Sequence, residues 1–236
     1  MKWLTRGGLL AALCVGAAIG WGLGWRGLLV LLAFFISGSL LTQLAVGPGG
    51  GAQRTARQVL ANGGVAAGAA LLGGAEAWSV AVAALAAATA DTWATEIGSF
   101  SPWTPRMVTT WASVPAGTSG GITLLGTAGG VAGAAGMAEL AALLQPRGGG
   151  GGGAPVSAAI VVVAGLAGMA VDSLLGATAQ GLFECPACAA RTERAGAVCH
   201  EPVVLIKGWR WLDNDGVNLA ATLTGAGVAV GWRLLH

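Results

Sequence analysis

GGLLAALCVGAAIGWGLGWRGLLVLLAFFISGSLLTQLAVG, residues 7–47, contains a single charged side chain, Arg26. A helix that crosses a membrane requires about 20 consecutive apolar residues, and this stretch is about twice that length. Because residues 24–26 divide it, it predicts two spanning helices, 7–24 and 27–47, joined as a tight hairpin. A signal peptide is the alternative, but there is no clear small-residue cleavage site and a second apolar run follows almost at once.

The composition of the chain indicates an integral membrane protein. The 236 residues are 55% hydrophobic and only 9% charged, with a mean hydropathy of +0.72, whereas soluble domains are about 25% charged. The 42 glycines and many alanines suit helices that pack closely in lipid. The net charge is +2 and there is no basic run, which argues against a nucleic-acid partner.

Five further apolar segments complete the predicted fold, an all-α polytopic membrane protein with one integral membrane domain, 1–236. The segments are 58–74, 77–95, 119–144, 156–182 and 212–235. The total is seven spanning helices, or six if the Gly-rich segment 58–74 does not cross. A loop at 183–208, which carries cysteines and a histidine, is expected in the cytoplasm.

The distribution of Lys and Arg predicts the orientation of these helices. With seven spans, nine of the 12 basic residues lie on the side of the N-terminus and three on the other side. The positive-inside rule then puts the N-terminus in the cytoplasm, and in a prokaryote the membrane would be the inner one. The same topology brings six polar clusters to the cytoplasmic face, which predicts a single site there. The clusters are QRTARQVLANGG (53–64), ADTWATEIG (90–98), TPRMVTT (104–110), VPAGTSGG (114–121), VDSLLGATAQG (171–181) and WLDNDGVN (211–218).

Five of the ten acids lie in or beside the predicted spans. Acids at the centre of a spanning helix cost about 2.5–3.5 kcal/mol on insertion scales and are usually functional. Asp172 shares a helical stripe with Gly168, Gly176 and Gln180, and the glycines leave room for a neighbouring backbone or a ligand. Helix capping is the plain alternative, and Asp213 could cap the last helix. The five acids are Asp91, Glu96, Asp172, Asp213 and Asp215.

These oxygen-bearing residues favour a divalent cation, since Mg²⁺ prefers oxygen ligands. The run WLDNDGVN alone supplies Asp213, Asn214, Asp215 and Asn218. Asp91 and Glu96 are five residues apart, which puts them about 140° apart around an ideal helix. Both can therefore face one ion only if the helix bends or ends between Asp91 and Gly98.

Glycines and basic residues at the same face favour a phosphate site. Thr118 and Ser119 precede two glycines just ahead of a predicted helix, whose N-terminus would attract an anion. There is no G-K-[ST], so a Walker-type loop is not implied. Arginines and lysines could neutralise phosphates, although any one alone is better explained by topology or lipid headgroups. The basic residues are Arg54, Arg57, Arg106, Lys207 and Arg210.

The cysteine loop carries a second constellation, CPACAARTERAGAVCH. A C-x-x-C followed by an adjacent Cys-His pair could hold a tetrahedral Zn²⁺. Neighbouring ligands are awkward to use together, so thiols without a metal are the alternative, and a stable disulfide is not expected in the cytoplasm. The candidate zinc ligands are Cys185, Cys188, Cys199 and His200.

The six polar blocks, in this order, resemble those of the domain-of-unknown-function-92 (transmembrane protein 19) membrane family, which includes a phytyl-phosphate kinase. They span about residues 53–225, and the first 50 residues carry no matching block. The resemblance implies a polytopic isoprenoid-phosphate kinase, and the residues considered above add Mg²⁺ and the cytoplasmic membrane face as expectations. Such an enzyme transfers the γ-phosphoryl group of a nucleoside triphosphate, expected to be CTP, to an isoprenoid monophosphate.

That reaction gives the site residues their expected roles. The five acids would hold Mg²⁺, directly or through water, and Thr118 and Ser119 would line the anion site. Substrate and nucleotide contacts are expected from Arg54, Arg57, Asn62, Arg106, Lys207, Asn214 and Asn218. The isoprenoid tail would lie among the membrane lipids, between Ala/Gly-rich helices.

Two other functions remain open. A transporter of ions or small solutes could use membrane acids, although the clusters lie at one face and no inverted repeat is visible. A lipid cytidylyltransferase needs the same metal and nucleotide but releases pyrophosphate, and the sequence does not separate it from a kinase. The oligomeric state and the length of the isoprenoid are also left open.

Overall fold

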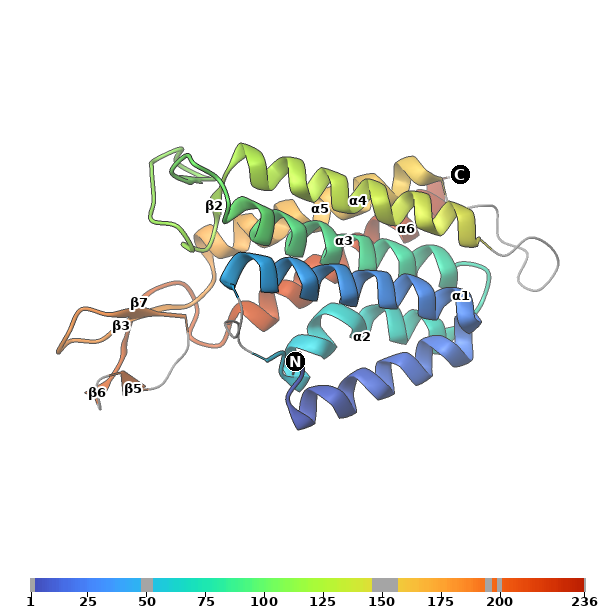
Figure 1. Cartoon of the computed structure of the whole chain (residues 1–236), viewed down its shortest axis with the longest axis horizontal. Coiled ribbons are helices and arrows are strands. Elements are labelled where there is room, and N and C mark those ends of the chain that lie inside the picture. Colours follow the sequence, from blue (N-terminus) through green and yellow to red (C-terminus); the bar gives the residue numbers. More distant parts are fainter. Residues whose placement is uncertain (1–2, 48–52, 146–156, 194–196, 199–200, 236) are drawn as a thin grey trace.

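The structure, a computed structural model, describes residues 3–47, 53–145, 157–193, 197–198 and 201–235. Within these ranges six helices lie lengthwise against one another as a bundle (Figure 1). They are α1 (Arg6–Val46), α2 (Ala56–Leu72), α3 (Ala77–Gly98), α4 (Leu124–Leu144), α5 (Ala158–Thr178) and α6 (Asn214–Leu235). Each apolar segment predicted from the sequence is therefore helical, with ends displaced by a few residues.

The helix α1 is two helical arms joined by a sharp kink. Gly24 has φ +67° and ψ −164°, a conformation that glycine adopts without the steric cost of a side chain. The second arm turns back toward the end where the first begins, and the two arms diverge from the kink (Figure 1), which confirms the predicted hairpin and gives seven helical segments among the described residues. Three helices, α1, α4 and α5, are long and apolar enough to cross a membrane. The number of spans and the cytoplasmic N-terminus remain predictions.

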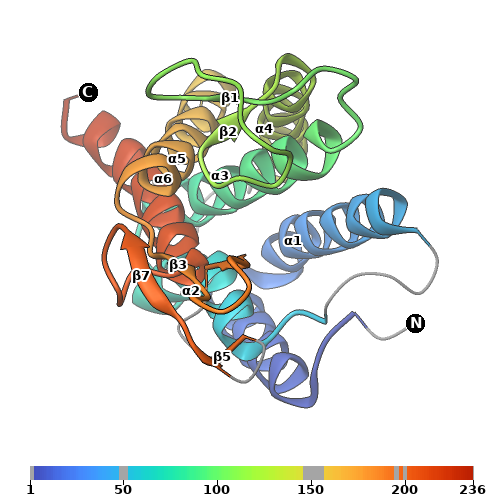
Figure 2. The ribbon, with the colours of Figure 1, turned by 90° about the vertical axis from the view of Figure 1, so that its left-hand side faces the viewer.

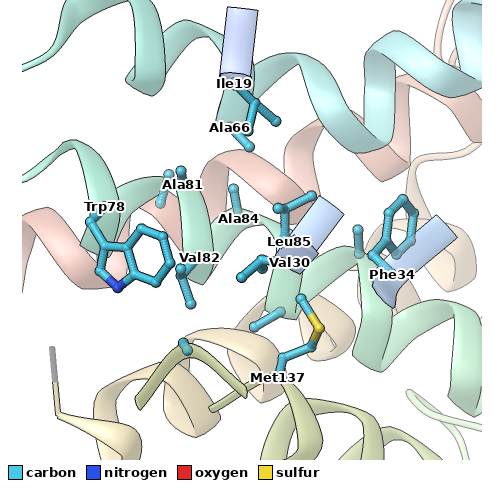
Figure 3. Close-up of a cluster of buried hydrophobic side chains, with 14 of the residues drawn as sticks. Ile19, Val30, Phe34, Ala66, Trp78, Ala81, Val82, Ala84, Leu85 and Met137 are labelled. Atoms are coloured by element: carbon cyan, nitrogen blue, oxygen red, sulfur yellow. The ribbon is translucent and has the colours of Figure 1, made fainter. Parts of the chain in front are cut away.

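The helix α3 occupies the centre of the bundle. It packs against each of the other five helices, and nearly every residue from Ala77 to Ala90 is buried. Its larger side chains Val82 and Leu85 meet apolar residues of α1 and Met137 of α4 (Figure 3). Because most of the other residues between Ala77 and Ala90 are alanines, neighbouring helices approach the α3 backbone closely from several sides.

Glycines on α5 and α6 make this close approach possible. A Cβ atom on Gly168 would overlap the Ala87 Cβ and would lie 2.8 Å from the Ala221 carbonyl oxygen. A Cβ atom on Gly225 would lie 2.6 Å from the Ala83 carbonyl oxygen. These two glycines therefore allow α5 and α6 to pack directly against the backbone of α3.

The prediction of an all-α chain is wrong for two segments that connect helices. The loop between α3 and α4 pairs β1 (Arg106–Met107) with β2 (Gly121–Ile122). After α5, a small β unit pairs β3 (Leu182–Glu184) with β4 (Arg191–Thr192) and β7 (Val204–Lys207), in the order β4-β3-β7. A separate pair follows β4 in the chain, β5 (Ala197–Val198) with β6 (Glu201–Pro202).

The small β unit has a core of its own, formed by Phe183, Cys185 and Val203. Strands of two to four residues leave little period-2 pattern in the sequence, which is why the segment read as a loop. Both β-containing segments lie at the same end of the bundle (Figures 1 and 2).

This end, called the polar end below, holds the starts of α1, α2, α4 and α6 and the ends of α3 and α5. Exposed tryptophans occur toward both ends of the bundle, with Trp103 and Trp111 in the α3–α4 loop at the polar end and Trp21 and Trp25 beside the kink of α1 at the opposite one. Tryptophan is typical of both membrane–water interfaces. A helix of 21 residues is about 30 Å long, the thickness of a bilayer core.

Candidate functional site

Two half-buried aspartates from neighbouring helices lie against each other near the polar end. The helices α3 and α5 run in the same direction, and Gly168 lies against Ala87. Residues four apart share a helix face, so one turn further along each helix Asp172 meets Asp91. Their carboxyl groups lie close enough to interact with each other. The glycine stripe that the sequence predicted around Asp172 therefore positions this acid pair.

The environment of the pair suits a positively charged partner. Two carboxylates in contact repel each other unless a proton or a cation lies between them. The Asp172 Oδ2 atom is buried and has no hydrogen-bond partner among the described residues. Asp91 lies seven residues before the end of α3, about 10 Å below it. The pair thus lies between the end and the middle of the bundle, deeper than the other polar clusters.

The loop between α3 and α4 covers the end of α5 above Asp172. Gly120 has φ +82°, and a Cβ atom there would lie 2.5 Å from the backbone nitrogen of Ala177. Gly176, one turn beyond Asp172, meets Ser119 and Gly120. These contacts require glycine, because any side chain would push the loop off the helix.

A lysine of the β unit holds the same helix end. The Lys207 Nζ atom donates to the carbonyl oxygens of Gly176 at 2.8 Å and Ala177 at 3.2 Å. A cation at a helix C-terminus is favourable. Burial lowers the pKa of Lys207, while the nearby Glu193 carboxylate acts in the opposite direction.

Glu193 is a candidate functional residue that sequence reasoning missed. It accepts a hydrogen bond from the Ser119 hydroxyl, and its charge acts on both Lys207 and Asp172. The residue lies just after β4 in the cysteine loop, where only the cysteines and a histidine gave a recognisable pattern. Its place beside Asp172 depends on how the β unit folds back over α5.

Glu96 does not join Asp91, so the expected bend in α3 is wrong. The helix continues to Gly98 with no break, and the two carboxylates face different neighbours. Glu96 accepts a hydrogen bond from the Thr42 Oγ1 atom of α1 at 2.6 Å. The prediction that Glu96 and Asp91 hold one metal ion is therefore corrected.

Arg54 lies near enough to Glu96 for their charges to interact. Its guanidinium lies 5.6 Å from the ring centroids of both Phe34 and Phe35, a cation–π arrangement. Burial lowers the pKa of Arg54, and the Glu96 carboxylate opposes that shift. This cluster ties α1, α3 and the segment before α2 together at the polar end.

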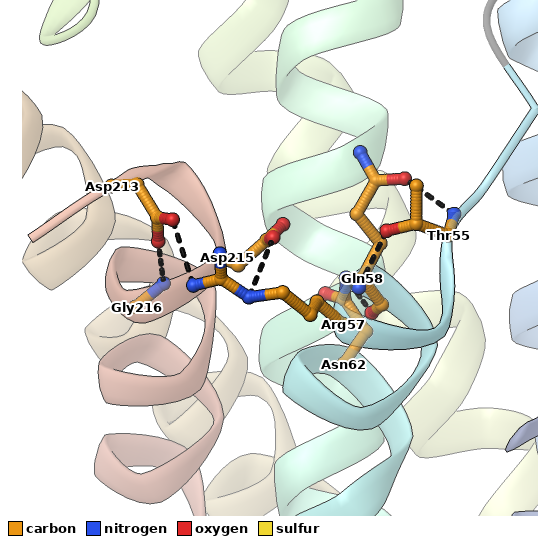
Figure 4. Close-up of polar contacts among 7 residues, drawn as sticks. All are labelled: Thr55, Arg57, Gln58, Asn62, Asp213, Asp215 and Gly216. Carbon is orange, nitrogen blue, oxygen red and sulfur yellow. Dashed lines mark hydrogen bonds and ion pairs between the residues drawn. The ribbon is translucent and has the colours of Figure 1, made fainter. Parts of the chain in front are cut away.

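A third polar cluster joins the starts of α2 and α6 (Figure 4). Arg57 pairs with Asp213 at 2.7 Å and with Asp215 at 3.6 Å. Asp213 also accepts a hydrogen bond from the Gly216 backbone nitrogen at 3.1 Å, the capping role that the sequence left open.

The asparagines that the sequence predicted as nucleotide contacts lie near this cluster. The Asn62 amide donates to the Gln58 carbonyl oxygen at 3.0 Å. Asn214 is exposed and Asn218 half-buried.

Two side chains predicted to bind an anion donate hydrogen bonds to backbone carbonyl oxygens instead. The exposed Arg106 donates to the Trp111 carbonyl oxygen at 2.9 Å, and the Thr118 hydroxyl to the Pro115 carbonyl oxygen at 2.7 Å. The helix α4 begins at Leu124, where the Thr123 hydroxyl caps it by accepting from Gly126. The expected helix start at residue 119 is wrong, so Thr118 and Ser119 do not lie at a helix N-terminus.

The five predicted metal ligands therefore fall into three places instead of one. Within the described ranges, no three acid, cysteine or histidine side chains lie close enough together to hold a metal ion. Of the three places, the Asp91–Asp172 pair fits Mg²⁺ best, because the buried Asp172 Oδ2 atom has no hydrogen-bond partner among the residues that the structure describes. Asp213 and Asp215 already face a guanidinium. Of the candidate zinc ligands, Cys199 and His200 lie outside the described residues, while Cys185 is buried and Cys188 exposed.

The ion pair of Arg57 gives a prediction about stability. We expect Arg57→Met to change the free energy of unfolding by less than about 1 kcal/mol, since the guanidinium is mostly exposed. Asp213→Ala should cost about 1 kcal/mol, because it also removes the cap of α6. Thermal unfolding in detergent measures both, and a larger loss for Arg57→Met would contradict this assignment.

The fold and the site together define a multi-pass integral membrane protein with an acid-lined site at one end of its helix bundle. Comparison with known protein families agrees, since the family described as "Integral membrane protein DUF92" matches residues 1–226. The chain belongs to this family. The match includes the first 50 residues, where no family block had been recognised.

Relatives of the chain occur in three kinds of organism. An uncharacterized membrane protein of Methanocaldococcus jannaschii is 31% identical over 235 residues, which cover 96% of this chain and 84% of that protein. One from Synechocystis is 28% identical over 245 residues, covering 98% and 83%. Protein PGR of Arabidopsis thaliana is 33% identical over 140 residues, covering 56% and 46%. No solved structure matches the chain.

Proposed function

We propose that the protein is a Mg²⁺-dependent isoprenoid-phosphate kinase that uses a nucleoside triphosphate, CTP being the expected one. The observation that carries the proposal is the half-buried Asp91–Asp172 pair, which lies about 10 Å below the polar end. Its Asp172 Oδ2 atom is buried and has no hydrogen-bond partner in the part of the chain that the structure describes. Its depth suits a reaction between a lipid phosphate from the bilayer and a nucleotide from water. The resemblance of the six polar blocks to the family's kinase supports the same reaction.

The chemistry needs charge neutralisation more than covalent participation by the protein. The acceptor phosphate is already an anion, so no strong base is required. Its oxygen forms a bond to the γ-phosphorus while the bond from that phosphorus to the β-phosphate oxygen breaks. The products are an isoprenoid diphosphate and a nucleoside diphosphate.

The residues of the site divide this work between them. Asp91 and Asp172 would hold Mg²⁺, which supplies positive charge to the transferring phosphoryl group. Lys207 and Arg57 lie at the polar end, where they would attract the anionic tail of the nucleotide. Ser119 and Glu193 hold the covering loop against the β unit and limit the access of water. To bind the nucleotide, Arg57 would leave its ion pair with the Asp213 carboxylate and contact a phosphate instead.

The isoprenoid chain would reach the site through the bilayer. Large apolar side chains are exposed along α1 and α5, for example Leu32, Leu40 and Val163. Exposed apolar surfaces of this kind are typical of helices in contact with lipid tails. The phosphate of a membrane-dissolved isoprenoid would then meet the acid pair from the side of the bilayer and the nucleotide from the polar end.

The test uses the full-length protein in detergent or liposomes with a γ-labelled nucleoside triphosphate, Mg²⁺ and a panel of isoprenoid monophosphates. Label transferred to lipid is the expected result. Label released as pyrophosphate would assign the protein as a cytidylyltransferase. No turnover, together with flux of a solute or ion into liposomes, would assign it as a transporter. Either of the last two results overturns the proposal.

A further inference from the structure

Two tryptophans at the polar end stack on each other beside the candidate site. The rings of Trp209 and Trp211 have centroids 5.4 Å apart and an interplanar angle of 16°. Both are exposed, by 54% and 72%. Because the two rings cover each other's inner faces, a planar ligand would stack on an outer face of the pair.

The backbone around these rings is firmly anchored. The Trp209 nitrogen donates to the Ala179 carbonyl oxygen at 2.8 Å, and the Leu212 nitrogen donates to the Trp209 carbonyl oxygen at 3.1 Å. Gly208 has φ +72° and packs against the backbone of Gln180 with no room for a side chain. The stacked pair is therefore a fixed part of the polar end, attached to the last residues before the β unit.

Along the chain, the stacked pair lies between residues of two charged clusters of the polar end. Two residues before Trp209, Lys207 caps α5 beside Glu193. Two residues after Trp211, Asp213 begins α6 and pairs with Arg57. A ligand with a flat ring and an anionic tail would match this order of aromatic faces and cations. A nucleoside triphosphate has both parts.

We propose that Trp209 and Trp211 form the platform on which the base of the nucleoside triphosphate stacks. The inference rests on the proposed function, since it names the base subsite of the nucleotide. An interfacial role in the membrane is the competing account, as for Trp103 and Trp111. Those two tryptophans lie in the α3–α4 loop and have no stacked ring among the described aromatic contacts, whereas the Trp209–Trp211 pair has its faces aligned.

The experiment measures equilibrium binding of Mg²⁺-CTP and Mg²⁺-ATP to the purified full-length protein. We expect the double variant Trp209→Ala/Trp211→Ala to raise the nucleotide Kd about 5- to 150-fold, the range of one stacked base. Trp209→Phe/Trp211→Phe should retain most of the affinity. Inorganic triphosphate should bind the wild type and both double variants equally, because it has no base.

Trp103→Ala is the matched control, since that side chain is 66% exposed at the same end. It should leave the nucleotide Kd unchanged. An unchanged Kd in the double alanine variant, with altered fluorescence quenching by brominated lipid, would assign the pair to the membrane interface and overturn the inference.

The outcomes separate this inference from the proposed function. Nucleotide binding that depends on the tryptophans, without transfer of label to any isoprenoid phosphate, would overturn the proposed kinase function and support the platform. Transfer of label with a Kd that does not depend on the tryptophans would support the kinase function and overturn the platform. A wild-type protein that binds no nucleotide would overturn both.

Discussion

Asp172→Asn is expected to lower phosphoryl transfer about 100- to 1,000-fold, the loss typical of removing one preorganised electrostatic group from a site. The substitution keeps the shape of the side chain and removes the charge that faces Asp91 and would hold Mg²⁺. The same change removes one of two neighbouring carboxyl groups that repel each other when both are charged. The protein should therefore unfold at the same or a higher temperature. Initial rates at saturating Mg²⁺, together with thermal unfolding in detergent, measure both effects.

Glu139→Gln provides the matched control for this prediction. Glu139 is an exposed acid on α4, outside the three polar clusters, and its loss should leave activity unchanged. Full activity of Asp172→Asn at saturating Mg²⁺ would remove the centre of the metal-site hypothesis. Lost activity with a markedly lowered unfolding temperature would instead assign Asp172 a structural role.

Gly168→Ala is expected to destabilise the bundle by about 1–3 kcal/mol, the usual cost of overpacking a tight core. The new methyl group would overlap Ala87 and press on the Ala221 carbonyl oxygen, so α5 would have to move away from α3. Because Asp172 lies one turn further along α5, the acid pair would separate as well. We therefore expect activity to fall together with the unfolding temperature.

Gly136→Ala tests whether space, rather than the glycine itself, explains that result. A Cβ atom on Gly136 meets nothing within 4 Å, and alanine is a better helix former than glycine by about 1 kcal/mol. Gly136→Ala should therefore be neutral or mildly stabilising. Equal losses in the two variants would contradict close helix packing at Gly168.

The sequence alone predicted the class of protein and the positions of the helices. A spanning helix can be recognised from its own segment, as a run of apolar residues long enough to cross a bilayer. The hairpin turn was likewise recognisable at residues 24–26. The family resemblance is likewise confirmed by the match over residues 1–226. The stripe of Gly168, Asp172 and Gly176 followed from helical periodicity, which needs no knowledge of the neighbouring helix.

The composition of the site was predicted less well, because facing directions depend on the register between helices. Asp91 and Glu96 lie in one polar block, yet one faces α5 and the other α1. Asp213 and Asp215 formed the densest oxygen cluster in the sequence, and the fold sets Arg57 against them.

By itself, then, the sequence determined a polytopic helical membrane protein whose polar residues gather at one end. Only the tertiary structure decided which acids meet: Gly168 packs on Ala87 and so brings Asp172 to Asp91. It also folded the cysteine loop into the β unit that carries Glu193 to the covering loop. The physical reason is that apolar length is a property of one segment, whereas the meeting of two carboxylates depends on how closely two backbones can approach.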